Sequence, residues 1–238
     1  MLGHGPTIVK DGLVLCLDAA NPKSYPGSGT TWYDLSGNGN NGTLVNGPTF
    51  NSDNKGSIVF DGSDDRTNFG NKSTFNFTGA EDVSIIAWIK PSLPTRFDGV
   101  ILGKFGYTLN KGWMFSITDY SGGTSPYLFM TYGTNTRASS KTLPASIYSQ
   151  WIFVAVTSKY QGQLLLYFNG LPLTGYTPAT IDTTVLSPSG IEMWAGQRID
   201  SSDRVYKGNM SVIQIYNRAL SAAEIAQNFE ATRGRYSI

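Results

Sequence analysis

The amino-acid sequence predicts an all-β protein built as a sandwich of two antiparallel sheets. Short apolar runs recur along the 238-residue chain between turn signals, without helices between them. This spacing is typical of sandwiches and barrels and not of βαβ units. The composition agrees, because charged residues make up only 15% of the chain while glycine contributes 27 residues. Many short strands joined by many turns have this composition.

The expected strands are apolar runs bounded by turn residues. They are residues 13–18, 57–61, 83–90, 99–104, 113–118, 127–132, 151–157, 163–168, 190–195 and 209–216. In residues 83–90 both alternating faces are apolar, with Ile85 and Ala87 on one side and Ile86 and Trp88 on the other. This pattern predicts a strand that is covered on both faces, and residues 151–157 share it.

Two local signals define a turn and a helix. Asn169-Gly170 lies between apolar runs and supplies the positive φ angles of a tight hairpin. Ser221 and Glu224 form a capping box, which predicts a short helix near the C-terminus that packs on the sandwich. Leu220 and Ile225 are spaced for a hydrophobic staple, and Gly234 offers a stop.

The chain is expected to form one domain. Residues 12–238 are assigned to the sandwich, and residues 1–11, which include the sole histidine His4, to an N-terminal arm. Residues 21–56 are rich in Gly, Asn, Ser and Pro but carry aromatic and leucine residues at intervals, so a packed irregular segment is expected. The single cysteine, Cys16, lies in an apolar run and is expected in the core.

Charge and terminal sequence limit the partners. Lys plus Arg number 18 and Asp plus Glu 17, so nucleic acid is not an expected partner. No apolar stretch is long enough for a membrane span, and residues 1–6 have neither a basic start nor a long apolar run. The expectation is a protein without a signal peptide, released by cell lysis or a dedicated export route.

Several motifs in order carry a family resemblance. They are DLSGNGNNGTL at residues 34–44, IVFDGSDD at 58–65, IIAWI at 85–89, WIFVAVT at 151–157, LYFNG at 166–170 and IYNRALSAAEI at 215–225. In this order they resemble laminin G-like domains of the concanavalin A-like lectin/glucanase superfamily, over residues 12–233. The resemblance implies a jelly-roll sandwich of two antiparallel sheets.

A narrower resemblance lies in GLVL at residues 12–15, DAANPKSY at 18–25 and WYD at 32–34. These residues are similar to laminin G-like proteins of tailed bacteriophages, which implies a virion surface protein: a capsid decoration, head fibre or tail adhesin. The partners would be other virion proteins and host-surface glycans, with a homo-oligomer also open. The localisation would be the virion, after synthesis in the host cytoplasm.

The sequence predicts no catalytic residues. Glucanase relatives carry two acidic residues at alternate positions of one strand, and none of the 17 acidic residues here is two positions from another. His4 in the arm is poorly placed for a catalytic triad or a zinc site. A carboxylate pair assembled from different strands stays open, so a glycan hydrolase is kept as an alternative, as is a stand-alone carbohydrate-binding module.

Two sets of candidate binding residues remain. The resemblance implies a Ca²⁺ site at the sandwich rim, for which Asp34, Asn38, Asp61 and Asp64 are the candidate ligands. Further acidic residues considered for it are Asp65, Asp200 and Asp203. Aromatic residues in or near loops could stack on sugar rings, and Trp32 with Tyr33 is the chosen candidate pair. Others considered were Tyr107, Trp113 and Tyr132, whereas Trp88 and Trp151 are expected in the core.

Overall fold

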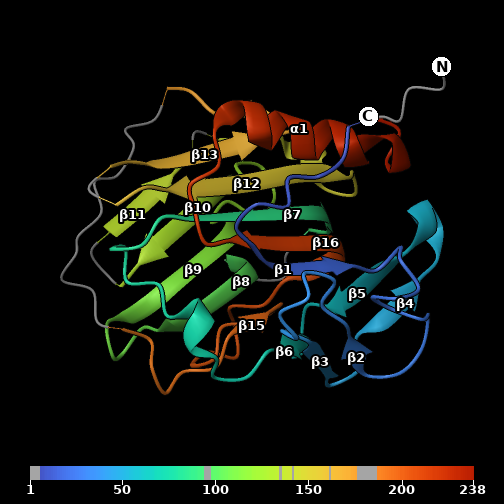
Figure 1. Cartoon of the computed structure of the whole chain (residues 1–238), viewed down its shortest axis with the longest axis horizontal. Coiled ribbons are helices and arrows are strands. Elements are labelled where there is room, and N and C mark those ends of the chain that lie inside the picture. The colour runs from blue at the N-terminus through green and yellow to red at the C-terminus, as the bar shows by residue number, and fades with distance from the viewer. Residues whose placement is uncertain (1–5, 94–97, 134–135, 141, 161, 176–186) are drawn as a thin grey trace.

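The computed structural model describes residues 6–93, 98–133, 136–140, 142–160, 162–175 and 187–238. Within these residues the chain forms two eight-stranded antiparallel sheets and one α-helix (Figure 1). The predicted two-sheet jelly-roll sandwich with a short C-terminal helix is therefore confirmed.

The two sheets are named here by their strands in spatial order. Sheet A contains β14 (Leu171–Pro172), β13 (Leu164–Phe168), β12 (Ile152–Ser158), β7 (Val83–Pro91), β16 (Lys207–Tyr216), β5 (Ser57–Asp61) and β4 (Thr49–Asn51), with β1 (Leu13–Asp18) also paired to β16. Sheet B contains β11 (Thr136–Ser139), β10 (Tyr127–Tyr132), β9 (Lys111–Thr118), β8 (Asp98–Gly106), β15 (Trp194–Ala195), β6 (Arg66–Asn68), β3 (Gly42–Val45) and β2 (Thr31–Trp32). Short 3₁₀ turns lie at Asp53–Lys55, Ser73–Phe75, Ala145–Ile147 and Arg233–Arg235.

The main core lies between the inner faces of the sheets. Ile85 and Ala87 of β7 face it from sheet A, and Trp113 and Phe115 of β9 face it from sheet B. Ile86 and Trp88 of β7 point to the opposite side and are buried in a second cluster. The prediction that β7 and β12 are covered on both faces is thus confirmed, and β1, β5 and β10 have the predicted bounds.

One predicted strand is largely wrong. Of residues 190–195, only Trp194 and Ala195 are assigned to a strand. Gly190 has a φ of 84°, and the Ile191 N–H donates to the Pro188 carbonyl 3.0 Å away. A turn therefore occupies the start of the apolar run.

Helix α1 (Ala222–Thr232) covers the outer face of sheet A and lies beside β13 and β12 in Figure 1. The predicted capping box between Ser221 and Glu224 is present. Below the helix, the Trp88 indole stacks on Tyr236 with ring centroids 3.9 Å apart and donates a 2.7 Å hydrogen bond to Thr232. The stop differs from prediction, because the chain continues into a 3₁₀ turn through Gly234.

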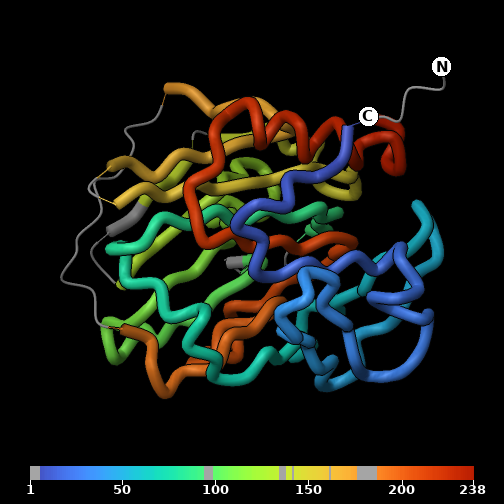
Figure 2. Tube along the Cα trace, in the orientation of Figure 1, coloured from blue at the N-terminus to red at the C-terminus, as the bar shows by residue number. Residues whose placement is uncertain are grey.

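The described part of the predicted N-terminal arm packs on the same face. Val9 is buried, its N–H donates to Asn228 of α1 at 2.8 Å, and its carbonyl accepts from Tyr216 of β16 at 2.9 Å. Figure 2 shows this first segment of the chain running beside the C-terminal helix and strand. His4 lies outside the described residues.

The predicted hairpin and the packed irregular segment are both confirmed. Asn169 and Gly170 have φ angles of 47° and 79°, and they join β13 to β14. A Cβ at Gly170 would lie 2.8 Å from the Phe229 ring, so helix packing also requires glycine there. Within residues 21–56, Tyr25, Trp32 and Leu44 are buried in the main core.

Candidate functional site

A pocket of about 300 Å³ opens on the outer face of sheet B, and we call it the tyrosine pocket. Its floor is apolar: Phe105 of β8, Met114 of β9 and Phe129 of β10 pack together there. Strand alternation places them, because Met114 lies opposite Thr131 in the β9–β10 register and both side chains face away from the core. No helix of the described chain covers this face.

Two exposed tyrosines form part of the rim. Tyr107 follows β8 and is 49% exposed, and Tyr120 follows β9 and is 57% exposed. Tyr107 contacts Phe105 edge-on, and Tyr120 lies against Tyr127 of β10. Exposed aromatic faces beside an apolar floor can take the apolar face of a ring-shaped ligand.

An arginine is held over one of these tyrosines. The Arg198 guanidinium lies 5.4 Å from the Tyr107 ring centroid, and its Nε lies 2.6 Å from Asp200 Oδ1. Asp200 Oδ2 accepts the backbone N–H of Tyr107 at 2.6 Å. One carboxylate therefore fixes both the arginine and the loop that carries the tyrosine. Arg204, from the same hairpin, also lines the tyrosine pocket.

The loop that carries Tyr120 is held by Asp119. This nearly buried carboxylate accepts hydrogen bonds from the backbone and hydroxyl of Ser121, both at 2.7 Å, and from the Tyr148 hydroxyl at 2.9 Å. Burial opposes ionisation, but these hydrogen bonds outweigh it and lower the pKa of Asp119. Asp119 therefore acts as an ionised anchor for the loop.

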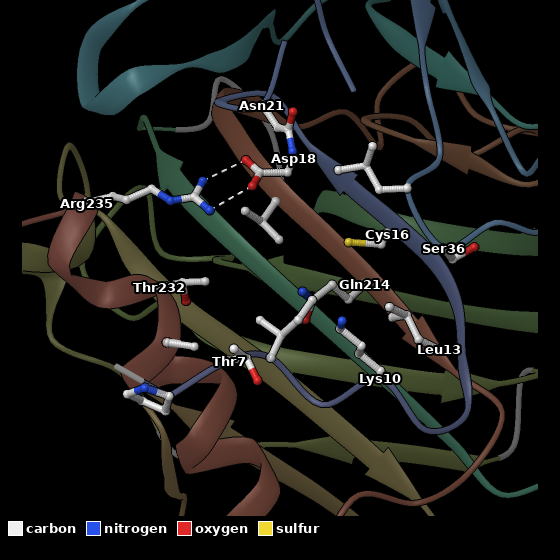
Figure 3. Close-up of a pocket in the computed structure, with 15 residues that line it drawn as sticks. Thr7, Lys10, Leu13, Cys16, Asp18, Asn21, Ser36, Gln214, Thr232 and Arg235 are labelled. Atoms are coloured by element: carbon white, nitrogen blue, oxygen red, sulfur yellow. Dashed lines mark hydrogen bonds and ion pairs between the residues drawn. The ribbon is translucent and has the colours of Figure 1, made fainter. Parts of the chain in front are cut away.

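A second pocket, of about 560 Å³, lies on the outer face of sheet A between β1, β16, α1 and residues 6–10; we call it the helix-side pocket (Figure 3). At one end Arg235 makes a two-pronged ion pair with Asp18, with both distances 2.7 Å. Cys16 and Gln214 lie opposite each other on its floor. Burial and nearby Asp18 raise the pKa of the Cys16 thiol to about 12, so it is not a nucleophile at neutral pH.

The candidate ligand Asp34 has a structural role. Its Oδ1 accepts the N–H groups of Cys16 and Ser36, and its Oδ2 accepts the Ser36 hydroxyl and the Asn40 N–H, all at 2.7–2.9 Å. A carboxylate offers about four acceptor positions. All four are used by the chain itself, which gives Asp34 a structural role in holding residues 34–40 against β1.

Asn38 belongs to the same structural group. Its amide donates to the Leu13 carbonyl at 3.2 Å and to the Ser36 hydroxyl at 3.0 Å. The Ser36 hydroxyl and the Asn40 amide in turn donate to the Val14 carbonyl. Residues 34–40 therefore satisfy the open edge of β1, and the Asn38 amide nitrogen takes part in this.

The other candidate ligands do come together. Asp61, Asp64 and Asp65 place one carboxylate oxygen each within 4.8 Å of one another, and Asp65 is buried. Burial raises the pKa of Asp65, and the charges of Asp61 and Asp64 raise it further. Three hard oxygen ligands at this spacing fit a Ca²⁺ ion, which would relieve the repulsion. Asp200 instead pairs with Arg198, and Asp203 accepts from the Ser201 hydroxyl.

Of the predicted aromatic pair, Trp32 and Tyr33, only Tyr33 lies on the surface. Trp32 is completely buried, so it has no surface for a sugar and its prediction as a ligand contact is wrong. Tyr33 is 45% exposed but does not line either pocket described above. Trp113 and Tyr132 are core residues, and Trp88 and Trp151 are buried as predicted. Only Tyr107, of the other aromatics considered, lines the tyrosine pocket.

Sequence reasoning missed Tyr120, Phe129, Arg198 and Arg204. A signal for Phe129 was present, because period two in β10 puts Tyr127, Phe129 and Thr131 on one face while Leu128 and Met130 enter the core. The arginines have no local signal, since their position depends on pairing between distant segments.

No helix of the described chain has the length and apolarity to cross a membrane.

Comparison with known proteins gives one family match. Residues 60–226 match the family described as the concanavalin A-like lectin/glucanases superfamily. No curated protein sequence matches the chain.

Solved structures share the fold at low identity. The binding domain of Paraclostridial Mosquitocidal Protein 1 is 19% identical with a TM-score of 0.66, and the match covers 92% of this chain and 52% of that one. Trypanosoma rangeli sialidase, in complex with sialic acid, is 16% identical with a TM-score of 0.66, over 95% and 34%. Domain 4 of AbnA, an extracellular GH43 arabinanase from Geobacillus stearothermophilus, in complex with arabinotriose, is 15% identical with a TM-score of 0.63, over 95% and 100%. The chain thus spans about half the length of the mosquitocidal protein chain and about a third of the length of the sialidase.

Proposed function

The chain belongs to the concanavalin A-like lectin/glucanase superfamily, and on this premise we propose that it binds carbohydrate in the tyrosine pocket without catalysis. The observation that carries the proposal is the pocket itself: two exposed tyrosines, Tyr107 and Tyr120, stand over an apolar floor on the face of the sandwich that α1 leaves open. The similar arabinanase domain in complex with arabinotriose supports a saccharide as ligand.

The size and lining of the pocket suit a sugar. A volume of about 300 Å³ is at the lower end of the range for small-molecule sites, which favours one or two sugar units. An aromatic ring can stack on the C–H face of a pyranose. Arg198 can donate hydrogen bonds to its hydroxyl groups.

The absence of catalysis is part of the proposal. Glycoside hydrolysis usually needs two carboxyl groups facing each other across the bond. No aspartate or glutamate is among the described residues that line the tyrosine pocket, and Asp200 behind it is engaged by Arg198 and the Tyr107 N–H. A glycan hydrolase is therefore the less favoured alternative, and release of reducing sugar from any bound glycan would support it.

A glycan array followed by titration calorimetry tests carbohydrate binding. We expect saturable binding to a limited set of glycans, weakened at least tenfold by Tyr107→Ala and by Tyr120→Ala, which corresponds to about 1.4 kcal/mol each. Tyr160→Ala is the matched control, because Tyr160 is 46% exposed and does not line the tyrosine pocket. Tyr33→Ala tests the pair predicted from sequence. An empty array, or binding indifferent to both pocket tyrosines, would refute the proposal.

We also propose that the domain acts on the surface of a phage particle and attaches it to host glycans. Its support is the resemblance of residues 12–34 to laminin G-like proteins of tailed phages. Other virion proteins would be its partners, with or without a homo-oligomer of this chain. Mass spectrometry and electron microscopy of purified particles test this, and absence of the chain from the virion would contradict it.

We propose that Asp61, Asp64 and Asp65 are ligands of a structural calcium ion. At a calcium concentration a hundred times the dissociation constant, binding would stabilise the fold by about 2.7 kcal/mol. Thermal unfolding with calcium and with a chelator measures this. The difference should vanish in Asp64→Asn and persist in Asp53→Asn, an exposed aspartate outside the cluster. If calcium stabilises both variants equally, the proposed calcium site at these aspartates is contradicted.

A further inference from the structure

We propose that the ligand of the tyrosine pocket is an acidic glycan, whose carboxylate is bound by Arg198 and Arg204. This inference rests on the proposed carbohydrate-binding function and specifies its ligand class. The two arginines are the only charged side chains among the described residues that line the pocket. The whole chain has a net charge of only +1, so this local cationic character is not a general property of the surface.

Arg198 is preorganised to bind an anion. Its Nε is held by Asp200 at 2.6 Å, and its guanidinium lies over the Tyr107 ring at 5.4 Å. Among the described residues its two terminal nitrogens make no hydrogen bond, and their N–H groups are the donors that a ligand would meet. Because the guanidinium is planar, these donors can meet both oxygens of a carboxylate at once.

The apolar floor strengthens this interaction. Phe105 and Met114 are nearly completely buried, so a ligand seated on them displaces water from the inner end of the pocket. A charge pair in such a partly dry site interacts more strongly than one in bulk water. A neutral sugar can stack on Tyr107 and Tyr120, but it carries no charge to pair with the arginines. The geometry therefore favours a sugar that carries both an apolar ring face and a carboxylate.

Asp200 is a positioning residue in this arrangement. It touches Arg198 and the Tyr107 backbone and does not line the tyrosine pocket. Its charge also partly offsets that of Arg198, and Arg204 adds a second guanidinium to the pocket lining. A carboxylate seated between the two arginines would face one guanidinium held by Asp200 and Tyr107 and a second from the same hairpin.

The test uses matched pairs of acidic and neutral glycans on the full chain. Suitable pairs are trigalacturonate and its methyl ester, cellobiouronate and cellobiose, and sialyllactose and lactose; galactose 6-sulfate is a non-carboxylate anion. By calorimetry we expect the acidic member of each bound pair to bind at least tenfold more tightly than its neutral partner. The preference should weaken as salt is raised from 50 to 500 mM, because salt screens the charge pair.

Variants assign the preference to the pocket. Arg198→Met and Arg204→Gln should each reduce the acidic-to-neutral affinity ratio to below threefold. Arg198→Lys keeps the charge but loses the fork, and it should restore only part of the ratio. Arg233→Met, an exposed arginine at the end of α1, is the matched control and should leave the ratio unchanged. Circular dichroism confirms that each variant is folded.

The outcomes separate the two proposals. Equal affinity for acidic and neutral members, or a ratio indifferent to both arginine variants, overturns this inference and leaves carbohydrate binding intact. Preference for the sulfate over every carboxylate overturns the choice of a carboxylate. Failure of all glycans to bind overturns the proposed function and this inference together.

Discussion

The two outer faces of the sandwich are built by the same strand alternation but meet different neighbours. On sheet A the outward side chains include Trp88, Phe153 and Tyr216, and α1 and the chain ends bury them in a second core. On sheet B the outward side chains include Phe105, Met114 and Phe129, and loops with tyrosines and arginines surround them. The first face is used for stability, and we assign ligand binding to the second.

The two pockets show the same contrast. In the helix-side pocket the charged groups Arg235 and Asp18 bind each other, and Gln214 and Cys16 on the floor are buried (Figure 3). In the tyrosine pocket Arg198 keeps donors that the described chain does not use. Two of the three charged residues that line the larger cavity, Arg235 and Asp18, are thus engaged with each other, and Lys10 is the third.

The largest effect on stability is expected from a substitution on the helix-covered face of sheet A. Trp88→Ala removes an indole that stacks on Tyr236 and Phe229 and bonds to Thr232. Loss of a buried tryptophan and the resulting cavity should lower the free energy of unfolding by about 3–5 kcal/mol. Urea unfolding measures it, and glycan affinity of the folded protein should be unchanged. A cost below 1 kcal/mol would show that α1 contributes little to the fold.

Breaking the ion pair of the helix-side pocket should have a smaller effect. Arg235→Gln leaves the mostly buried Asp18 carboxylate without its partner, and we expect a loss of about 2 kcal/mol. Arg235→Lys retains the charge without the two-pronged geometry and should lose less. Urea midpoints of the three proteins give the ranking. If Arg235→Gln unfolds at the wild-type midpoint, the ion pair does not contribute to the stability of the fold.

The start of α1 gives a pH-dependent effect of about 1 kcal/mol or less. Hydrogen bonds from Arg218 and from the Ser221 N–H lower the pKa of Glu224 from 4.5 to about 2. A folded-state pKa below the unfolded value means that this stabilisation is complete above about pH 4.5 and is lost as pH falls towards 2. Because the pair is partly exposed, solvent screens it. The stability difference between wild type and Glu224→Gln should therefore shrink between pH 7 and pH 2.5; a constant difference would contradict the linkage.

The smallest effect on stability is expected from substitutions on the open face of sheet B. Tyr107→Ala and Tyr120→Ala remove exposed rings and should change the free energy of unfolding by less than about 0.5 kcal/mol. The same variants are expected to lose at least tenfold in glycan affinity. Urea unfolding and calorimetry on the same preparations compare the two effects. A loss of more than 2 kcal/mol would mean that these tyrosines support the fold and are not kept for a ligand.

Much of the fold could be predicted from sequence because its signals are local. The alternation of Ile85 to Trp88, the Asn169-Gly170 turn and the Ser221–Glu224 capping box each depend on neighbouring residues. The short strands of residues 31–51 were not predicted. The position of β3 is set by pairing with β6, further along the chain, whereas β4 is a three-residue strand that pairs with nearby β5.

The site was less predictable because an aromatic residue in a turn-rich segment can face either way. Trp32 and Tyr33 are neighbours, yet one is fully buried and the other is exposed. Asp34 and Asp64 both look like calcium ligands in sequence. Only the structure shows that hydrogen bonds from residues 16, 36 and 40 occupy Asp34, while Asp64 shares a cluster with Asp61 and Asp65.

The most direct test is to map the bound glycan by NMR. Amide resonances of the ¹⁵N-labelled chain would be followed during titration with the tightest ligand of the array. The account predicts that the largest shifts cluster around the tyrosine pocket, at Tyr107, Tyr120, Thr131 and Arg198, while residues of α1 stay in place. Shifts centred on the helix-side pocket, around residues 7–18 and 231–235, would contradict it.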